Sequence, residues 1–434
     1  MKQSLTTTWK RLTTGILGDV AGYVGGRAVG MAVAAITGII VARYLGPEDL
    51  GLLGFAASIY AIAVPVALLG MRQILVREFS ANDDWRPILA SALSRQIPVA
   101  VITSLVGFVI IVAARSGDRA AVLVAIALLP FPLLAVRDTI QALHEVAGRV
   151  RLIVLSTVGA AIAASGVKIL AVAMGAPVWV FAAATTLEAV IVLLALWWGN
   201  RQTSGSAGGR MAVDSEKARA LVRESWPLLI GAVAVTLYMR VDVAMLGLLS
   251  GDEETGLYVA ATRISELWYF VPVAAMAAIR PRLSRRYAAN EMDAYKQETQ
   301  QVLTAGWVLS LIAIILTVIF AGALILFLYG DAFTGSETVL RIHILAAPFV
   351  FLGVGASQWF VDRGLTREVM VRSVAGAVAN IGINLLLIPA YGATGAAIAT
   401  LISYGISGVF LNAASAKTRP VFVMQMKALI GARH

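Results

Sequence analysis

Apolar residues occur in long runs along this chain. A helix that crosses a bilayer needs about 20 mostly apolar residues. By that measure the sequence contains twelve candidate spans, which cover residues 22–43, 51–70, 88–113, 120–143, 152–174, 177–199, 225–248, 256–279, 302–328, 338–361, 368–388 and 392–414. We therefore predict an all-α integral membrane protein with about twelve transmembrane helices.

The pattern around the second span returns 205 residues later in the sequence. In each case a short acidic turn precedes an apolar run, and a group of arginines follows it. When the two copies are aligned on Gly51 and Gly256, Arg77 falls on Arg282. A duplication of this kind predicts two pseudo-repeated six-helix bundles around a central cavity.

The same reading divides the chain into five parts. They are a cytoplasmic N-terminal segment (1–20), an N-terminal six-helix bundle (21–199), a linker (200–224), a C-terminal six-helix bundle (225–414) and a cytoplasmic tail (415–434). The linker contains a Gly/Ser-rich stretch at residues 204–209, which is typical of a flexible connection. A flexible connection suits bundles that rock against each other.

The composition supports a membrane protein and narrows its chemistry. Hydrophobic residues make up 59% of the chain and charged residues only 14%, too few to cover a soluble protein of this size. There is no cysteine, so disulfides and thiolate metal sites are excluded, and the three histidines do not stand at a metal-ligand spacing. No nucleotide-binding or catalytic motif is present. We expect no metal, no cofactor and no enzymatic activity.

The basic residues predict the orientation in the membrane. With the N-terminus placed in the cytoplasm, the cytoplasmic segments hold 24 lysines and arginines, and the outer loops hold only Arg43, Arg115 and Arg119. Such an excess on one side is the usual signature of the cytoplasmic face. Both termini are therefore expected in the cytoplasm. Topology explains the net charge of +10 better than nucleic-acid binding does.

Eight basic residues fall inside the predicted spans, where a charge is costly and usually faces a bundle interior or a wet cavity. They are Arg27, Arg95, Arg137, Lys168, Arg240, Arg263, Arg341 and Arg372. Acidic residues are fewer there, which predicts a cationic cavity for a phosphate or diphosphate. The candidate substrate-binding residues are Arg240, Arg263, Arg27, Lys168 and Arg372. Snorkelling to the interface is the alternative for several of the eight.

Two buried acids are candidates for ion coupling, namely Asp242 and Glu188. The alternative is that each is the counter-ion of a neighbouring basic residue, since Lys168 and Glu188 lie on adjacent predicted helices. Arg263 can also reach Glu266 on its own helix at a spacing of three residues.

Several motifs resemble those of the polysaccharide-exporter and O-antigen-flippase branch of the multidrug/oligosaccharidyl-lipid/polysaccharide (MOP) exporter superfamily. The resembling segments are residues 43–52, Gly70 with 75–78, 240–242 with 245–247, 256–258 with 260–261, and Asn384 with 387–389 and 391–400. Together they extend over nearly the whole chain. Arg240 is the residue whose motif position matches best, followed by Arg27 and Arg263.

The resemblance implies two six-helix bundles that work by alternating access at a cytoplasmic membrane. Its implied cargo is an undecaprenyl-diphosphate-linked oligosaccharide for cell-surface polysaccharide biosynthesis, with a polysaccharide polymerase and glycosyltransferases as partners. Three alternatives stay open at this point. They are an ion-coupled multidrug exporter of the same superfamily, a peptidoglycan-precursor (lipid II) flippase, and a non-transporting partner in a polysaccharide assembly complex.

Overall fold

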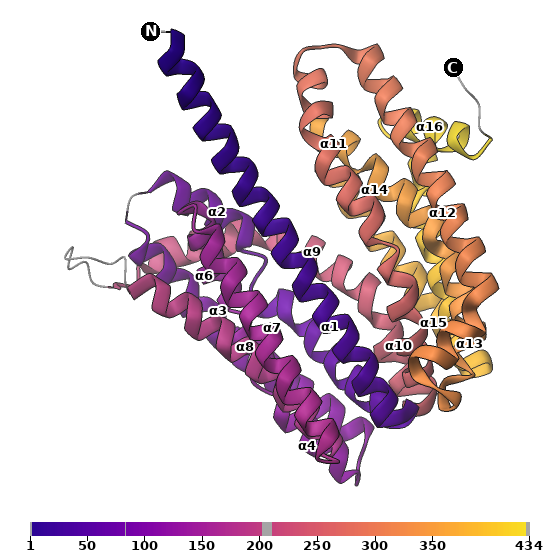
Figure 1. Ribbon diagram of the computed structural model, residues 1–434. Helices are drawn as coiled ribbons and strands as arrows, with labels where there is room; N and C mark the ends of the chain where they lie inside the picture. The colour runs from indigo at the N-terminus through magenta and orange to yellow at the C-terminus, as the bar shows by residue number, and fades with distance from the viewer. Residues whose placement is uncertain (1, 83, 202–210, 431–434) are drawn as a thin grey trace. The chain divides into compact units, whose positions relative to one another are not determined.

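A computed structural model describes residues 2–82, 84–201 and 211–430, with the side chains of residues 2–29, 31, 200 and 201 outside the description. Within these ranges the regular elements are all helices (Figure 1). The long helices are α1 (Lys2–Ala67), α3 (Arg86–Ala114), α7 (Val150–Ala173), α8 (Val178–Arg201), α9 (Ser215–Leu249), α12 (Met292–Tyr329) and α15 (Thr366–Gly408). The shorter ones are α2 (Arg72–Ala81), α4 (Arg119–Leu128), α5 (Phe131–Leu134), α6 (Arg137–Val146), α10 (Asp252–Leu267), α11 (Phe270–Ala288), α13 (Ser336–His343), α14 (Ala347–Asp362) and α16 (Arg419–Leu429).

The chain forms two compact units. Unit 1 contains residues 1–44 and 59–232, and unit 2 contains residues 45–58 and 233–434. The division falls within α9, whose first part belongs to unit 1 and whose second part belongs to unit 2. It also gives the segment 45–58 of α1 to unit 2, although the sequence places this segment among the helices of the first bundle.

The prediction of about twelve transmembrane helices is confirmed. In the described part of the chain, nine helical segments are long and apolar enough to cross a membrane. Two of these segments each contain two helices, joined at Gly46 within α1 and at Gly392 within α15, where the backbone is not helical. The span predicted at 256–279 is covered by α10 and α11, with a break at residues 268–269.

Prolines break some of the predicted spans into short helices. The span predicted at 120–143 consists of α4, α5 and α6, and Pro130 and Pro132 lie where the first break occurs. Proline has no N–H to donate and clashes with the preceding turn, so two prolines close together favour a break in the helix there. The span predicted at 338–361 is likewise divided, and Pro348 stands in the first turn of α14.

The backbone shows the duplication directly at the two acidic turns. Gly46 has φ 73° and ψ 178°, and Gly251, which is 205 residues further on, has φ 90° and ψ −176°. Only glycine adopts this region readily. Arg77 and Arg282, which the sequence alignment equates, both bind a glutamate, Glu224 and Glu298 respectively.

The two repeat-equivalent glycines also pack against each other's turn within unit 2. A Cβ atom at Gly51 would overlap the carbonyl oxygen of Asp252, and one at Gly256 would overlap the carbonyl oxygen of Pro47. Asp252 is 205 residues beyond Pro47, so the two contacts are equivalent. The segment 45–58 and α10 therefore cross about a local pseudo-two-fold axis, with backbones close enough that only glycine fits.

Unit 2 contains a helical hairpin formed by the two halves of α15. Gly392, with φ 52°, makes the turn, and a Cβ atom at Gly395 would overlap the carbonyl oxygen of Leu387. The Glu254 carboxylate accepts a 2.6 Å hydrogen bond from the Ala393 N–H. A carboxylate at this place satisfies a free donor at a helix start and interacts favourably with the helix dipole. This acid of the second acidic turn thus has a structural role.

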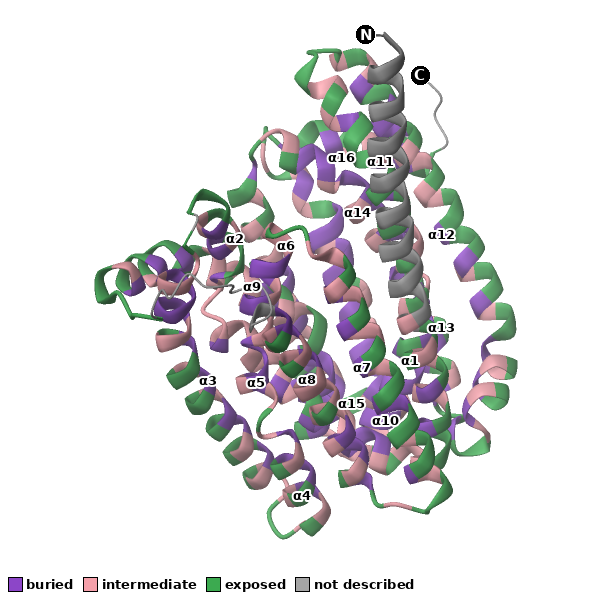
Figure 2. Cartoon of the chain, turned by 60° about the vertical axis from the view of Figure 1, so that its left-hand side comes forward, coloured by how far each residue is buried: buried purple, intermediate pink, exposed green. Residues whose placement is uncertain are grey.

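The exposed surface of several long helices is apolar. Figure 2 shows exposed positions along the length of α3 and α12, and those on α12 include Ile315, Ile319, Phe320 and Phe327. Exposed apolar surface on this scale is costly in water and favourable against lipid tails. The protein is thus a multi-pass membrane protein, as predicted.

The helix α9 begins at Ser215, earlier than the sequence suggested. The Asp214 carboxylate accepts hydrogen bonds from the N–H groups of Glu216 and Lys217, at 2.9 and 3.0 Å, and so caps the helix. Residues 215–224, predicted as part of the linker, are therefore helical. The Gly/Ser-rich stretch at residues 204–209 lies outside the described residues.

Candidate functional site

Arg240 and Arg263 lie at matching depth on two consecutive helices of unit 2. Arg240 precedes the end of α9 at Leu249 by nine residues, and Arg263 follows the start of α10 at Asp252 by eleven. At 1.5 Å per residue, both lie roughly 14–16 Å from the turn between the helices, which is about half of a 30 Å hydrocarbon core. Both side chains are exposed within the unit. They can therefore meet a ligand at mid-membrane depth.

Acidic side chains accompany these arginines. Glu266, one turn beyond Arg263 on α10, interacts electrostatically with both Arg240 and Arg263. The two guanidinium groups also repel each other. Asp242 also interacts electrostatically with Glu266, so two basic and two acidic side chains influence one another in this part of unit 2.

Asp242 is buried in the same unit, among neutral partners. Its carboxylate accepts hydrogen bonds from Asn384 Nδ2 at 2.5 Å, Thr400 Oγ1 at 2.9 Å and the Tyr258 hydroxyl at 3.1 Å. Asn384 and Thr400 come from the two halves of α15, and Tyr258 comes from α10. Its hydrogen-bond donors are an amide and two hydroxyls, not an arginine or lysine.

The amides next to Asp242 form a chain. Asn384 donates to Asn380 Oδ1 at 3.0 Å, and Asn380 donates to Ser403 Oγ at 3.2 Å. The Asn384 Oδ1 atom is buried and accepts no hydrogen bond from the described residues. A buried carboxylate beside a free amide oxygen and a hydroxyl offers oxygen ligands to a hard cation or a place for a proton.

Arg372 has a different environment from Arg240 and Arg263. Its Nε donates to the Ser407 carbonyl at 2.8 Å and its Nη2 to the Gly408 carbonyl at 3.4 Å, while its guanidinium lies 4.4 Å from the centre of the Phe360 ring. The carbonyls belong to the last turn of α15, which has no intrahelical partners for them. Arg372 therefore joins the two ends of the α15 hairpin.

Replacing Arg372 by leucine is expected to destabilise unit 2. The substitution leaves the final carbonyls of α15 without their charged donor, which costs about 2 kcal/mol. A thermal unfolding curve of the full chain in detergent would show the lower midpoint. The matched control is Arg367→Leu, because Arg367 is exposed in the first turn of the same helix. Equal midpoints for the two variants would contradict this role.

The remaining predicted residues lie in unit 1. Lys168 on α7 and Glu188 on α8 are both partly exposed, and the two helices pack closely. The side chain of Arg27 lies outside the described residues. Two other cations within the spans have acidic partners, since Arg137 lies 3.7 Å from Asp138 and Arg341 lies 2.6 Å from Glu337.

Tyr258 and Thr400 were not predicted from the sequence as site residues. Both residues stand in motifs that resemble the flippase branch, but nothing in their local spacing indicates that they meet Asp242. The three residues are separated by up to 158 positions in the sequence. Only the folding of α9, α10 and α15 against one another brings them together.

Two known protein families match parts of this sequence. The family described as "Polysaccharide biosynthesis protein" matches residues 16–287, well over half of the chain. The chain belongs to this family. The MatE family matches residues 227–386, which confirms the resemblance to the MOP superfamily.

A curated relative of this polysaccharide biosynthesis protein is the "Probable low-salt glycan biosynthesis flippase Agl15" of Haloferax volcanii. It is 26% identical over 227 residues, which are 51% of this chain and 46% of that protein. A second, the "Probable flippase AglR" of the same organism, is 27% identical over 177 residues, which are 40% of this chain and 37% of that protein. The chain thus matches about half, or less, of the length of these relatives.

A structure of the lipid II flippase MurJ in an inward closed conformation has the same fold. Its TM-score is 0.74 at 12% identity, and the match covers 94% of this polysaccharide biosynthesis protein and 90% of that chain. At this identity the likeness concerns the fold only, so it does not carry over the substrate of that protein.

Proposed function

We propose that this polysaccharide biosynthesis protein is a flippase that moves a polyprenyl-diphosphate-linked oligosaccharide across the cytoplasmic membrane. The bundles alternate in access to the two sides, and the lipid tail stays in the bilayer while the sugar crosses. The cargo serves cell-surface polysaccharide biosynthesis, with an undecaprenyl carrier and with glycosyltransferases and a polymerase as partners. Both termini are cytoplasmic, in line with the 24 basic residues on that side.

The observation that carries this proposal is the pair of exposed arginines at mid-membrane depth, Arg240 and Arg263. Two exposed guanidinium groups at this depth suit an anion better than a cationic drug. Arginine binds phosphate through two parallel hydrogen bonds, so the pair is suited to a diphosphate. Arg27, Lys168 and Arg372 are further candidates for contact with the headgroup or the sugar. The names of the curated relatives support a glycan-linked cargo.

A binding measurement tests the anion site without requiring transport. The full chain in detergent is heated with a polyprenyl diphosphate and, separately, with the corresponding polyprenol. A ligand that binds only the folded state raises the unfolding midpoint. We expect a rise with the diphosphate that Arg240→Gln removes, and little rise with the polyprenol. Equal rises with both compounds would contradict a diphosphate site.

Asp242 is the proposed site of ion coupling. Its carboxylate, the free Asn384 Oδ1 and the Thr400 hydroxyl are the oxygens that would receive Na⁺ or a proton. Binding of a cation there would compensate a buried carboxylate whose hydrogen-bond donors among the described residues are neutral. Because these atoms join α9 to both halves of α15, occupancy would change the packing of unit 2. Glu188 is the second candidate for coupling.

Asp242→Asn is expected to abolish coupling to the cation while leaving the anion site intact. Sodium should raise the unfolding midpoint of the wild type and of Glu188→Gln, but not that of Asp242→Asn. Flipping by Asp242→Asn should become independent of sodium and pH gradients. If Glu188→Gln loses the response and Asp242→Asn keeps it, the coupling site lies in unit 1.

The other functions make different demands on the same residues. An exporter of cationic drugs would need an acidic binding surface, and Glu266 is outnumbered by Arg240 and Arg263. A lipid II flippase would carry the same diphosphate on a different sugar, so it shares the proposed anion site. A non-transporting assembly partner would need these arginines only for stability.

A further inference from the structure

A second group of arginines lines a cavity in unit 1. The cavity has a volume of about 400 Å³ and is lined by Leu69, Arg95, Val99, Arg219, Val222 and Arg223. We call it the arginine cavity. Its basic residues come from α3 and from the first part of α9, and its other walls are apolar. The cavity surface is thus mainly apolar, and three arginine side chains stand at its wall.

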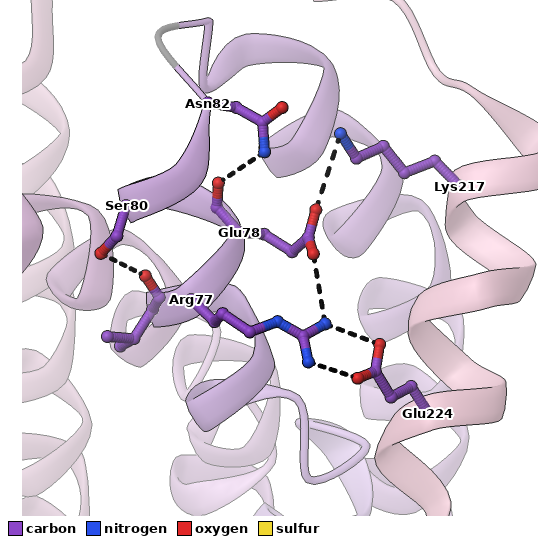
Figure 3. A network of polar contacts seen from close by, with 7 residues as sticks. Arg77, Glu78, Ser80, Asn82, Lys217 and Glu224 are labelled. Carbon is purple, nitrogen blue, oxygen red and sulfur yellow. Dashed lines mark hydrogen bonds and ion pairs between the residues drawn. The ribbon is translucent and has the colours of Figure 1, made fainter.

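The arginines of this cavity differ from two neighbouring basic residues, each of which lies beside a glutamate. Figure 3 shows Arg77 of α2 bound to Glu224, at 2.8 Å for Nη2 to Oε2, and Lys217 near Glu78 at 3.8 Å. Lys217 and Glu224 lie on the same part of α9 as Arg219 and Arg223. Among the described residues, Arg95, Arg219 and Arg223 have no acidic partner within 4 Å. Their charge is available to a ligand.

On α3 and on α9, exposed apolar residues follow the arginines along the same face of the helix. On α3, Ile102 and Val106 follow Arg95 on one helical face, and both are more than half exposed.

On α9, the residues that follow Arg219 and Arg223 on their face are Trp226 and Ile230, which are 56% and 43% exposed. A charged end followed by an apolar stripe has the polarity of a lipid molecule, with its headgroup at the arginines and its chain along the stripe.

The turn at the cavity wall is held in a strained conformation. Leu69 has φ 54°, a region that non-glycine residues seldom adopt, and Gly70 follows with φ 63°. A Cβ atom at Gly70 would lie 2.5 Å from the Leu229 nitrogen, so α9 packs directly on this turn. Strain of this kind persists where surrounding packing enforces it, often at ligand sites. Here it places the Leu69 side chain in the cavity.

We infer that the arginine cavity binds a lipid with a phosphate or diphosphate headgroup. The three guanidinium groups hold the headgroup oxygens through charge-assisted hydrogen bonds. The chain lies against Val99, Val222 and the apolar stripe of α9. The headgroup belongs either to a bulk anionic phospholipid or to a polyprenyl diphosphate. This site does not depend on the transport activity proposed above, because it uses none of the same residues.

The test measures lipid binding by the full chain in detergent, with native mass spectrometry as the readout. The probes are phosphatidylglycerol, phosphatidylcholine, a polyprenyl diphosphate and inorganic diphosphate. We expect the two anionic lipids to bind more tightly than phosphatidylcholine and inorganic diphosphate. Each single Arg→Gln substitution at Arg95, Arg219 or Arg223 should weaken binding about tenfold. The tighter of the two anionic lipids identifies the source of the headgroup.

Two further variants control for charge and for folding. Arg151→Gln removes an exposed arginine of unit 1 outside the cavity and should leave binding unchanged. Val222→Trp keeps all three arginines but fills the apolar part, and should weaken lipid binding while sparing any binding of inorganic diphosphate. The inference is overturned if the triple variant of Arg95, Arg219 and Arg223 binds anionic lipid as the wild type does. It is equally overturned if inorganic diphosphate binds as tightly as the lipids.

Discussion

Arg240→Gln is expected to slow the flipping of a polyprenyl-diphosphate sugar by about 10- to 100-fold, because a charge-assisted contact to phosphate is lost. Arg263→Gln should act in the same direction, and the double variant should approach the rate of protein-free liposomes. Arg240→Lys should retain part of the activity, since lysine keeps the charge but loses the paired hydrogen bonds. The measurement is outer-leaflet exposure of a fluorescent lipid-linked sugar in proteoliposomes.

The matched control for these variants is Arg341→Gln. Arg341 is also a cation within a span of unit 2, but it lies 2.6 Å from Glu337 on its own helix and has its charge compensated there. We expect wild-type flipping from this variant. Wild-type flipping by Arg240→Gln, in protein that reconstitutes normally, would remove Arg240 from the anion site.

Gly51→Ala and Gly256→Ala are each expected to lower the free energy of unfolding by about 1–3 kcal/mol. The added methyl group would overlap the carbonyl oxygen of Asp252 or of Pro47, and a backbone atom cannot turn aside as a flexible side chain does. The segment 45–58 and α10 would have to separate, and the packing about the pseudo-two-fold axis would be lost. Thermal unfolding in detergent measures the effect.

A glycine in open space provides the comparison for these two variants. Gly159 lies within α7, and a Cβ atom there has no neighbour within 4 Å. Gly159→Ala should be neutral or slightly stabilising, because alanine is the better helix former. If Gly51→Ala and Gly256→Ala are as stable as Gly159→Ala, the close contact between the two repeats is not needed for the fold.

The helices and the duplication could be predicted from the sequence because the bilayer imposes a simple rule. Each span must be long and apolar, so its position is visible without knowledge of its neighbours. The repeat was equally visible, and the shared backbone conformation of Gly46 and Gly251 agrees with an alignment made on other residues. The breaks within spans followed from prolines whose positions were known, although the resulting short helices were not predicted.

The partners of the interior charges could not be predicted in the same way. Asp242 was considered as the counter-ion of an arginine, whereas its hydrogen-bond donors are Asn384, Thr400 and Tyr258. Arg372 resembled Arg240 in the sequence, yet it binds the last carbonyls of α15. Which charge faces a neighbour and which faces open space depends on how distant helices pack.

The arginine cavity could not be predicted from the sequence either. Arg95 was one of eight cations within the spans, while Arg219 and Arg223 counted only toward the cytoplasmic charge. Folding of α9 against the turn at Leu69 and Gly70 brings the three together around one cavity. The sequence shows an arginine followed by apolar residues on both α3 and α9. It does not show that these two helices line the same cavity.

Reconstitution in proteoliposomes shows whether the cargo is an anionic lipid-linked sugar or a cationic drug. Purified wild-type protein in proteoliposomes receives a fluorescent polyprenyl-diphosphate sugar, and a membrane-impermeant quencher reports its exposure. Uptake of a cationic dye is followed in parallel vesicles. We expect protein-dependent flipping of the lipid and no dye transport. Dye transport without lipid flipping would contradict this expectation and would place the protein among drug exporters.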